Sequence, residues 1–223
     1  MVEITNTKVY DLKESVIASR NAMRLTPPEY TDEEFEKAMG RATKLASCGG
    51  GSGHSNFRKG IRVSFDIKYP GYFTPELQRY SFMDIVTSSS KMHRLVRMDL
   101  DVACNKYVTS GAIKMMKQLV AVYNRINDTK ESDFKGEWFV LRDKTEIFAE
   151  KKGDALYYAF MRCVSNCPQG IELFMRCSTN YEQLATIYKQ RKNHRLREDW
   201  GAFIEWIKGL PMADELILVG LEK

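Results

Sequence analysis

Apolar and polar residues alternate most regularly in the stretch GIRVSFDIKYP, residues 60–70. The apolar side chains occupy every second position, at Ile61, Val63, Phe65 and Ile67. Because successive side chains of a strand point to opposite faces of the sheet, this pattern predicts a strand with one buried face and one polar face. Residues 2–10, VEITNTKVY, alternate well enough to predict a first strand.

Helical patterns are more frequent along the chain than strand patterns. The segments that we predict to be helical are 12–23, 31–48, 74–82, 107–126, 154–164 and 197–208. Thr31 and Thr74 stand where N-cap residues are preferred, and Pro75 is typical of a first helical position. Short strands are predicted within EWFVL (137–141) and ELILVG (215–220). This set of elements predicts an α+β fold, with an antiparallel sheet flanked by long helices.

The stretch CSTNYEQLATIYKQRKNHRLREDW, residues 177–200, predicts a further helix, and its apolar stripe contains polar groups. Thr179 and Glu182 have the spacing of a capping box. At about 100° per residue, the positions that share one helix face are Asn180, Leu184, Ile187 and Arg191, with His194 beyond them. A stripe that faces a core therefore carries the amide of Asn180 at its N-terminal end. It carries the guanidinium of Arg191 and the imidazole of His194 at its C-terminal end.

The guanidinium of Arg191 needs a partner, because burying an unpaired charge is strongly unfavourable. Two interpretations remain open from the sequence. In the first, Arg191 forms an ion pair with Glu172, Glu182 or Glu198. In the second, it holds a phosphate through two parallel N–H bonds.

Length and composition indicate a globular protein. A chain of 223 residues with 43% apolar residues suits one domain, or one domain with an elaborate insertion, and we expect a single domain over residues 1–223. The net charge of +5 is compatible with anionic ligands such as nucleotides, but it is weak support for nucleic acid. No apolar run approaches about 18 residues and no signal peptide is visible, so we expect a cytoplasmic protein without a membrane segment.

The cysteines indicate neither a disulfide framework nor a metal site. They are Cys48, Cys104, Cys163, Cys167 and Cys177. Cys163 and Cys167 are four positions apart near a predicted helix, but no second pair and no suitably spaced histidine accompanies them. We expect reduced, mostly buried thiols.

Two polar stretches are candidate anion or ligand sites. In TSSSK (87–91), Ser89, Ser90 and Lys91 offer hydroxyls and a positive charge to an anion, although serine runs are usually loops. His54, in GSGHSNF, directly precedes the clearest strand, although a lone histidine is more often structural or exposed. The run GGGSG (49–53) lacks the P-loop pattern and predicts a turn. The residue pattern yields no catalytic triad.

The order of four segments resembles that of the flavin-dependent thymidylate synthases. These segments are GHSNF (53–57), RVSFDIKYP (62–70), LQRYSFMDIVTSSSKM (77–92) and TNYEQLATIYKQRKNH (179–194), and the resemblance covers roughly residues 1–208. The family signature RHRxxSxNExSxRY is incomplete here. Arg79 takes the place of its first arginine, whereas Tyr80 and Ser81 stand where the family has histidine and arginine.

The resemblance implies roles for individual residues. FAD would contact His54, Arg79, Asn180 and His194. The nucleotide would contact Ser89 or Ser90, Lys91, Arg162 and Arg191. Arg191 matches an arginine that holds the nucleotide phosphate, and His54 matches a histidine near the folate and flavin rings, so these two are the implied catalytic residues.

The resemblance also implies an activity and an assembly. The reaction would transfer a methylene group from methylenetetrahydrofolate to C5 of dUMP or a related pyrimidine deoxynucleotide, with reduced FAD as hydride source and NADPH as a further cofactor. The site would be shared between the subunits of a homotetramer and would contain no protein nucleophile.

Two alternatives to this activity stay open. One is a non-catalytic nucleotide-binding relative that has lost flavin, which the altered signature favours. The other is a small nucleic-acid-binding protein that uses the basic stretch KQRKNHRLR (189–197). Because no aromatic platform accompanies that stretch, nucleic acid is not the partner we expect.

Overall fold

The computed structural model describes residues 1–48 and 53–221, so the run GGGSG lies, apart from Gly53, outside the described residues. The chain forms two compact units. Unit 1 comprises Met1–Tyr69, Phe73–Ser88 and Phe174–Lys223, and unit 2 comprises Pro70–Tyr72 and Ser89–Leu173. Most of unit 2 is therefore one continuous insertion into the sequence of unit 1. The expectation of a single domain stays a prediction.

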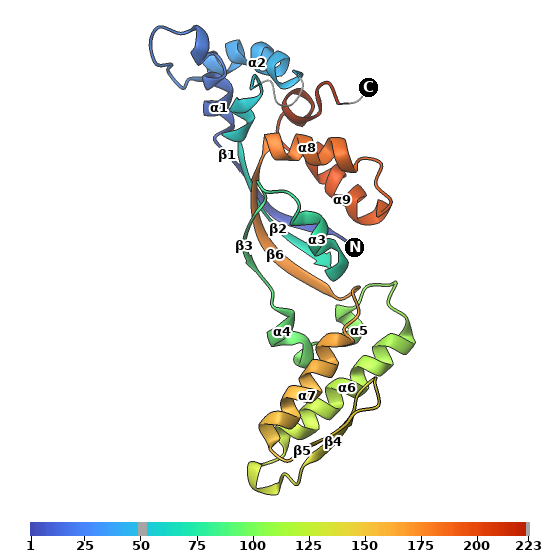
Figure 1. Ribbon diagram of the computed structural model, residues 1–223. Helices are drawn as coiled ribbons and strands as arrows, with labels where there is room; N and C mark the ends of the chain where they lie inside the picture. The colour runs from blue at the N-terminus through green and yellow to red at the C-terminus, as the bar shows by residue number, and fades with distance from the viewer. Residues whose placement is uncertain (49–52, 222–223) are drawn as a thin grey trace. The chain divides into compact units, whose positions relative to one another are not determined.

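The core of unit 1 is a four-stranded sheet (Figure 1). Its strands are β1 (Glu3–Tyr10), β2 (Arg62–Pro70), β3 (Asp84–Ser88) and β6 (Glu172–Asn180), in the spatial order β1-β2-β6-β3. β1 pairs with β2 and β3 pairs with β6, both antiparallel. The alternation that predicted β2 is confirmed, because Val63, Phe65 and Ile67 are buried and the residues between them are more exposed.

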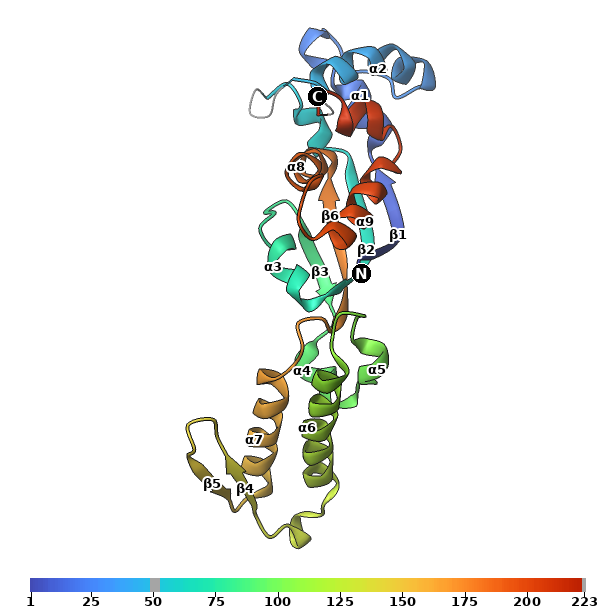
Figure 2. The same cartoon turned by 90° about the vertical axis from the view of Figure 1, so that its right-hand side faces the viewer.

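Helices cover one face of this sheet. Figures 1 and 2 show α8 (Tyr181–Arg191) and α9 (Arg197–Lys208) lying across it. Their apolar side chains, including Leu184, Ile187, Trp200 and Phe203, are almost completely buried. Unit 1 also contains α1 (Leu12–Ala18), α2 (Asp32–Ala46), the short α3 (Thr74–Leu77) and a π-helix at Asp214–Leu218. Helices on one face of an antiparallel sheet confirm the predicted α+β class.

Unit 2 is built around a pair of helices. Its elements are α4 (Lys91–Arg94), α5 (Leu100–Ala103), α6 (Ser110–Asp128), α7 (Lys152–Ser165) and a hairpin of β4 (Glu137–Val140) and β5 (Glu146–Ala149). Helices α6 and α7 lie side by side in both views (Figures 1 and 2). A buried cluster under the hairpin contains Ile126, Phe139, Ala149, Ala155 and Ala159.

Several local predictions are wrong, each for a physical reason. The N-cap of α8 is Asn180, whose Oδ1 accepts from the Gln183 backbone N–H at 2.9 Å, so Thr179 is not the cap. Thr179 belongs to β6 instead, and its hydroxyl donates to the Phe82 carbonyl. The stretch 74–82 is helical only over its first turn, with Phe73 as the N-cap.

The C-terminal segment ELILVG is also wrongly predicted. It forms most of a π-helix rather than a strand, with Leu216, Ile217 and Leu218 buried. A short apolar run fits a buried strand and a buried helical turn equally well, and the sequence gives no periodicity to separate them.

The expectation of mostly buried thiols holds for two of the five cysteines, because Cys163 and Cys177 are buried whereas Cys48, Cys104 and Cys167 are partly exposed. All five are free, and burial raises the pKa of Cys163 to about 11 and that of Cys177 to about 12. Among residues 1–48 and 53–221, no group of three histidine, cysteine or acidic side chains is placed to hold a metal ion. In the same ranges, no helix is both long enough and apolar enough to cross a membrane.

The Asn180 cap is testable by mutation. We expect Asn180→Ala to lower the free energy of unfolding by about 1 kcal/mol, because the Gln183 N–H loses its acceptor. Urea unfolding followed by circular dichroism measures this loss. Thr186→Ala is the matched control, since Thr186 lies exposed in the middle of α8 and alanine has the higher helix propensity. Equal unfolding midpoints for wild type and Asn180→Ala would contradict the cap.

Candidate functional site

A cavity of about 510 Å³ opens in unit 1 beside α8. It is bounded by the 3₁₀-helix at Asn56–Lys59, by the segment that leads into β3, and by one face of α8. The lining residues are Lys59, Arg79, Tyr80, Ser81, Phe82, Asn180, Glu182, Gln183, Thr186, Gln190 and Arg191. The cavity thus brings together residues separated by more than 100 positions in the sequence.

Arg191 lies at the C-terminal end of α8 and is held on several sides. Its Nη1 is 2.9 Å from Glu76 Oε2, and its Nε donates to the Tyr80 hydroxyl at 2.6 Å. The guanidinium also lies over the ring of Trp200, 4.8 Å from the ring centroid. Only 10% of the Arg191 side chain and 20% of the Glu76 side chain are exposed. Arg191 therefore does form an ion pair, but with Glu76 rather than with Glu172, Glu182 or Glu198.

Tyr80 connects the segment before β3 to the end of α8. Its hydroxyl accepts from Arg191 and donates to Gln190 Oε1 at 3.1 Å. Burial raises the pKa of Tyr80, and the hydrogen bond from Arg191 acts in the opposite direction. The phenol therefore stays protonated and able to donate to Gln190.

Glu182, in the first turn of α8, is held by a second buried ion pair. Arg58 Nη2 lies 2.6 Å and Arg58 Nε 2.7 Å from Glu182 Oε2, and the Ser55 hydroxyl donates to Oε1 at 3.2 Å. Arg58 is nearly buried, and its Nη1 donates to the Leu216 carbonyl at 3.2 Å. This pair neutralises Glu182, so the carboxylate adds little negative charge to the cavity.

Hydrogen-bond donors dominate the remaining lining. The amide oxygens of Asn180, Gln183 and Gln190 accept from the Gln183 N–H, the Phe82 N–H and the Tyr80 hydroxyl, respectively. Because two of these donors are backbone N–H groups, the orientations of the Asn180 and Gln183 amides are fixed. The three amide nitrogens donate to no described residue, and neither Lys59 nor Arg79 has an ion-pair partner among them. Such a lining suits a ligand rich in acceptor oxygens.

The cavity unites three of the residues that the sequence singled out, namely Arg79, Asn180 and Arg191. His194 lies just past the end of α8, with its ring 6.1 Å from that of Trp200 and its Nδ1 accepting from the Leu196 N–H. Burial, and then the charge of Arg191, lower the pKa of His194. Neither His194 nor the exposed His54 is among the lining residues.

The other candidate residues belong to unit 2. They are Ser89, Ser90, Lys91 and Arg162. Ser90 is the N-cap of α4, and its hydroxyl accepts from the His93 N–H at 3.4 Å. Arg162 lies exposed in the last turn of α7. The proposed contacts of these four residues with a nucleotide stay predictions.

Sequence reasoning missed several lining residues. Lys59 was overlooked because it follows the buried Arg58 in a short 3₁₀-helix that no pattern predicted. Gln183 and Gln190 are seven positions apart on α8, a spacing of two helical turns, and that spacing is the signal that would have found them.

The sequence matches no protein-family model and no curated protein. Solved structures do match. The chain is similar to the flavin-dependent thymidylate synthase ThyX from Helicobacter pylori, in complex with FAD and dUMP, with 14% identity and a TM-score of 0.61 over 96% of this chain and 97% of that one. It is also similar to the UMP/dUMP methylase PolB from Streptomyces cacaoi, bound with 5-Br dUMP, with 11% identity and a TM-score of 0.55 over 99% of this chain and 96% of that one. The chain therefore has the fold of the flavin-dependent thymidylate synthases, which the order of its segments had indicated.

Proposed function

We propose that the cavity beside α8 binds a pyrimidine deoxynucleotide of the dUMP class, and that the chain catalyses one-carbon transfer at C5 of the base. The observation that carries this proposal is the donor-rich lining. Lys59 and Arg79 supply positive charge, and the amide nitrogens of Asn180, Gln183 and Gln190 supply donors. A phosphate group and a uracil ring both present acceptor oxygens, so the two ends of such a nucleotide match this lining.

The similar solved structures support the choice of nucleotide. ThyX was solved with dUMP, and PolB with 5-Br dUMP. Under the proposal, Arg191 donates to the phosphate, and Glu76, Tyr80 and Trp200 hold its guanidinium in place. The protein contributes binding, orientation and electrostatics, which agrees with a chain in which we identified no nucleophile with an activating base.

Flavin fits the described residues less completely than the nucleotide does. Where the family signature has histidine and arginine, this chain has Tyr80 and Ser81, and the Tyr80 hydroxyl is already bonded to Gln190 and Arg191. Arg79 and Asn180 line the same cavity as the proposed nucleotide site, and we propose that they also contact FAD, bound beside the nucleotide. When bound and reduced, flavin supplies the hydride, and methylenetetrahydrofolate supplies the carbon.

A second candidate is a non-catalytic nucleotide-binding protein of the same fold. The engagement of Tyr80 favours it, because a flavin that needed this position would have to compete with two internal hydrogen bonds. The two candidates share the nucleotide site and differ in flavin and chemistry.

Nucleotide binding is tested at Arg191. We expect the wild type to bind dUMP in calorimetry, and Arg191→Ala to weaken binding by roughly 2–4 kcal/mol, the range for losing a buried charge-assisted contact. Arg191→Lys should restore only part, because an ammonium cannot reproduce two parallel N–H bonds.

A matched variant separates binding from packing. Glu76→Gln removes the charge that pairs with Arg191, and Glu76 is not itself a lining residue of the cavity. It should lower stability while dUMP binding persists. If well-folded Arg191→Ala binds dUMP as tightly as the wild type, Arg191 only forms the ion pair with Glu76. The proposal that Arg191 binds the nucleotide phosphate is then wrong.

Flavin binding is tested by absorbance. After incubation with FAD and removal of free cofactor, we expect the protein to retain a flavin spectrum and to melt at a higher temperature, because a ligand that binds only the folded state stabilises it. Arg79→Ala should reduce the retained flavin. No retained absorbance and no change in melting temperature would leave the non-catalytic candidate.

The assembly is tested by light scattering. We expect a homotetramer, because the resemblance implies a site that is shared between subunits. A stable monomer at micromolar concentration would contradict both the assembly and a shared active site, while leaving the cavity of the single chain as a nucleotide site.

A further inference from the structure

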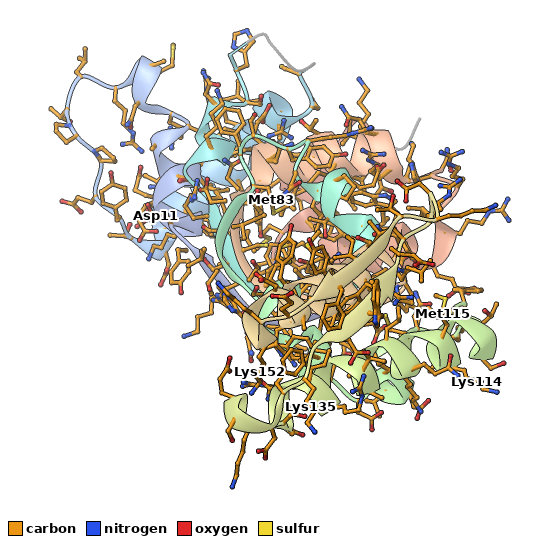
Figure 3. All side chains as sticks on the ribbon, turned by 60° about the horizontal axis from the view of Figure 1, so that its bottom comes forward. Asp11, Met83, Lys114, Met115, Lys135 and Lys152 are labelled. Atoms are coloured by element: carbon orange, nitrogen blue, oxygen red, sulfur yellow. The ribbon has the colours of Figure 1, made fainter. Side chains whose placement is uncertain are left out.

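Phe82 is the more exposed of the two aromatic residues in the described lining of the cavity beside α8. The other, Tyr80, is 6% exposed, and its hydroxyl is already bonded to Gln190 and Arg191. Phe82 is 58% exposed, whereas the neighbouring Met83 lies within unit 1 (Figure 3) and is 7% exposed. A planar base can stack on such a ring, and stacking depends little on which base it is. Phe82 therefore offers affinity for a base without selectivity.

The backbone of Phe82 is tied to the start of α8 on both sides. The Thr179 hydroxyl donates to the Phe82 carbonyl at 2.9 Å, and the Phe82 N–H donates to Gln183 Oε1 at 3.4 Å. The N–H of Gln183 in turn donates to Asn180 Oδ1 at 2.9 Å. The place of Phe82 beside α8 is thus fixed by internal hydrogen bonds, which reduces the entropy lost when a ligand binds there.

Gln183 presents a buried hydrogen-bond donor to the cavity. The residue is 7% exposed and still belongs to the lining. Because the Phe82 N–H can only donate, the group that it meets must be the amide oxygen of Gln183, and the amide nitrogen is left for another partner. This nitrogen donates to no described residue. A buried donor without an acceptor is unfavourable, so an acceptor oxygen of a ligand is favoured beside it.

The side chains next to Gln183 offer no competing acceptor. The oxygen of Asn180 is engaged by the Gln183 N–H, and the carboxylate of Glu182 is paired with Arg58. At C4 of the ring, uracil carries a carbonyl oxygen, whereas cytosine carries an amino group. The Gln183 amide nitrogen can donate to the carbonyl of uracil, but in a cytosine nucleotide two donors would face each other.

We propose that Phe82 and Gln183 form the base-binding part of the nucleotide site, and that they select a uracil over a cytosine nucleotide. The base stacks on Phe82, and Gln183 Nε2 donates to O4 of uracil. Gln183 and Arg191 are eight positions apart on α8, which is about 12 Å along the helix axis. A mononucleotide whose phosphate lies at Arg191 then extends along the helix towards Gln183. The inference rests on the proposed nucleotide site and assigns the residues that choose its base.

The test compares dUMP with dCMP by calorimetry on the full chain. The two nucleotides share phosphate and sugar, so the ratio of their dissociation constants reports on the base alone. We expect dUMP to bind at least roughly tenfold more tightly, because an unpaired buried donor disfavours cytosine. If both bind equally, the nucleotide site stands and the base selection is wrong, as it would be if Gln183 met O2, which the two bases share. If neither binds, the proposed function fails and the inference fails with it.

Two substitutions of Gln183 separate donor from charge. Gln183→Glu keeps an oxygen for the Phe82 N–H and replaces the amide nitrogen by an acceptor, so dCMP should bind more tightly than dUMP. A carboxylate in the first turn of α8 is favoured by the helix dipole, so we expect this variant to fold. Gln183→Met removes the donor without adding charge and should bring the two affinities close together. Gln118→Glu makes the same charge change at an exposed position of α6 and should preserve the preference for dUMP.

A substitution of Phe82 separates stacking from selection. Phe82→Leu should weaken dUMP and dCMP by the same factor, roughly tenfold, and leave their ratio unchanged. Phe174→Leu is the matched control, since Phe174 is 55% exposed in unit 1 and is not a lining residue. Circular dichroism checks that each variant is folded. Undiminished preference for dUMP in folded Gln183→Met, or unchanged affinity for both nucleotides in folded Phe82→Leu, would overturn the proposal.

Discussion

The Arg191 guanidinium carries a full positive charge into the interior of unit 1, with only 10% of its side chain exposed. Such a charge is unfavourable unless an opposite charge and hydrogen bonds compensate for the lost water. Glu76 supplies the charge, Tyr80 the hydrogen-bond acceptor, and Trp200 a polarisable ring face. These partners come from α3, from the segment after it and from α9. The requirement of one buried cation therefore fixes α9 and the stretch that contains α3 and Tyr80 around the end of α8.

A second buried pair does the same at the other end of the helix. Glu182 lies in the first turn of α8, where a carboxylate is favoured by the helix dipole, and Arg191 lies in the last turn, where a cation is favoured. Arg58 holds Glu182 and thereby joins α8 to the 3₁₀-helix at Asn56–Lys59 and to the C-terminal π-helix. The cavity lies between these two ion pairs, Arg191–Glu76 and Arg58–Glu182. Its walls are therefore set by internal ion pairs, without a requirement for a ligand.

The sequence predicted elements well where periodicity was clear, and poorly where burial was not one-sided. β2 was predicted because its buried and exposed residues alternate, and α6 because its apolar face is continuous. β3 was missed because all five of its residues are exposed at the sheet edge, so no alternation marks it. β6 was missed because its inward residues include Cys177 and Thr179, and Thr179 also fits a helix cap. In the sequence, a threonine that caps a helix cannot be distinguished from a threonine at the end of a strand that leads directly into a helix.

For the candidate site, the sequence identified the right helix and, through the family resemblance, Arg79, but not the other residues around the cavity. Asn180 and Arg191 were singled out because an amide and a guanidinium interrupt an apolar stripe, and both line the cavity. The partner of Arg191 was not predictable, because Glu76 is 115 positions away and only the fold brings it near. Lys59 was not predicted as a lining residue for the same reason, because only the fold brings it near α8. Sequence patterns identify polar side chains within apolar stripes, whereas the tertiary structure determines which charged residues form ion pairs.

That pairing also determines how an anion can be held. The charge of Arg191 is paired with Glu76 at 2.9 Å, so Arg191 offers a phosphate directed N–H donors rather than an uncompensated charge. Glu182 is likewise balanced by Arg58. The uncompensated charges of the lining are those of Lys59 and Arg79, at the exposed edge of the cavity. Under the proposed function, these two cations attract the nucleotide from solution, and the buried arginine supplies the directed short contacts that hold its phosphate.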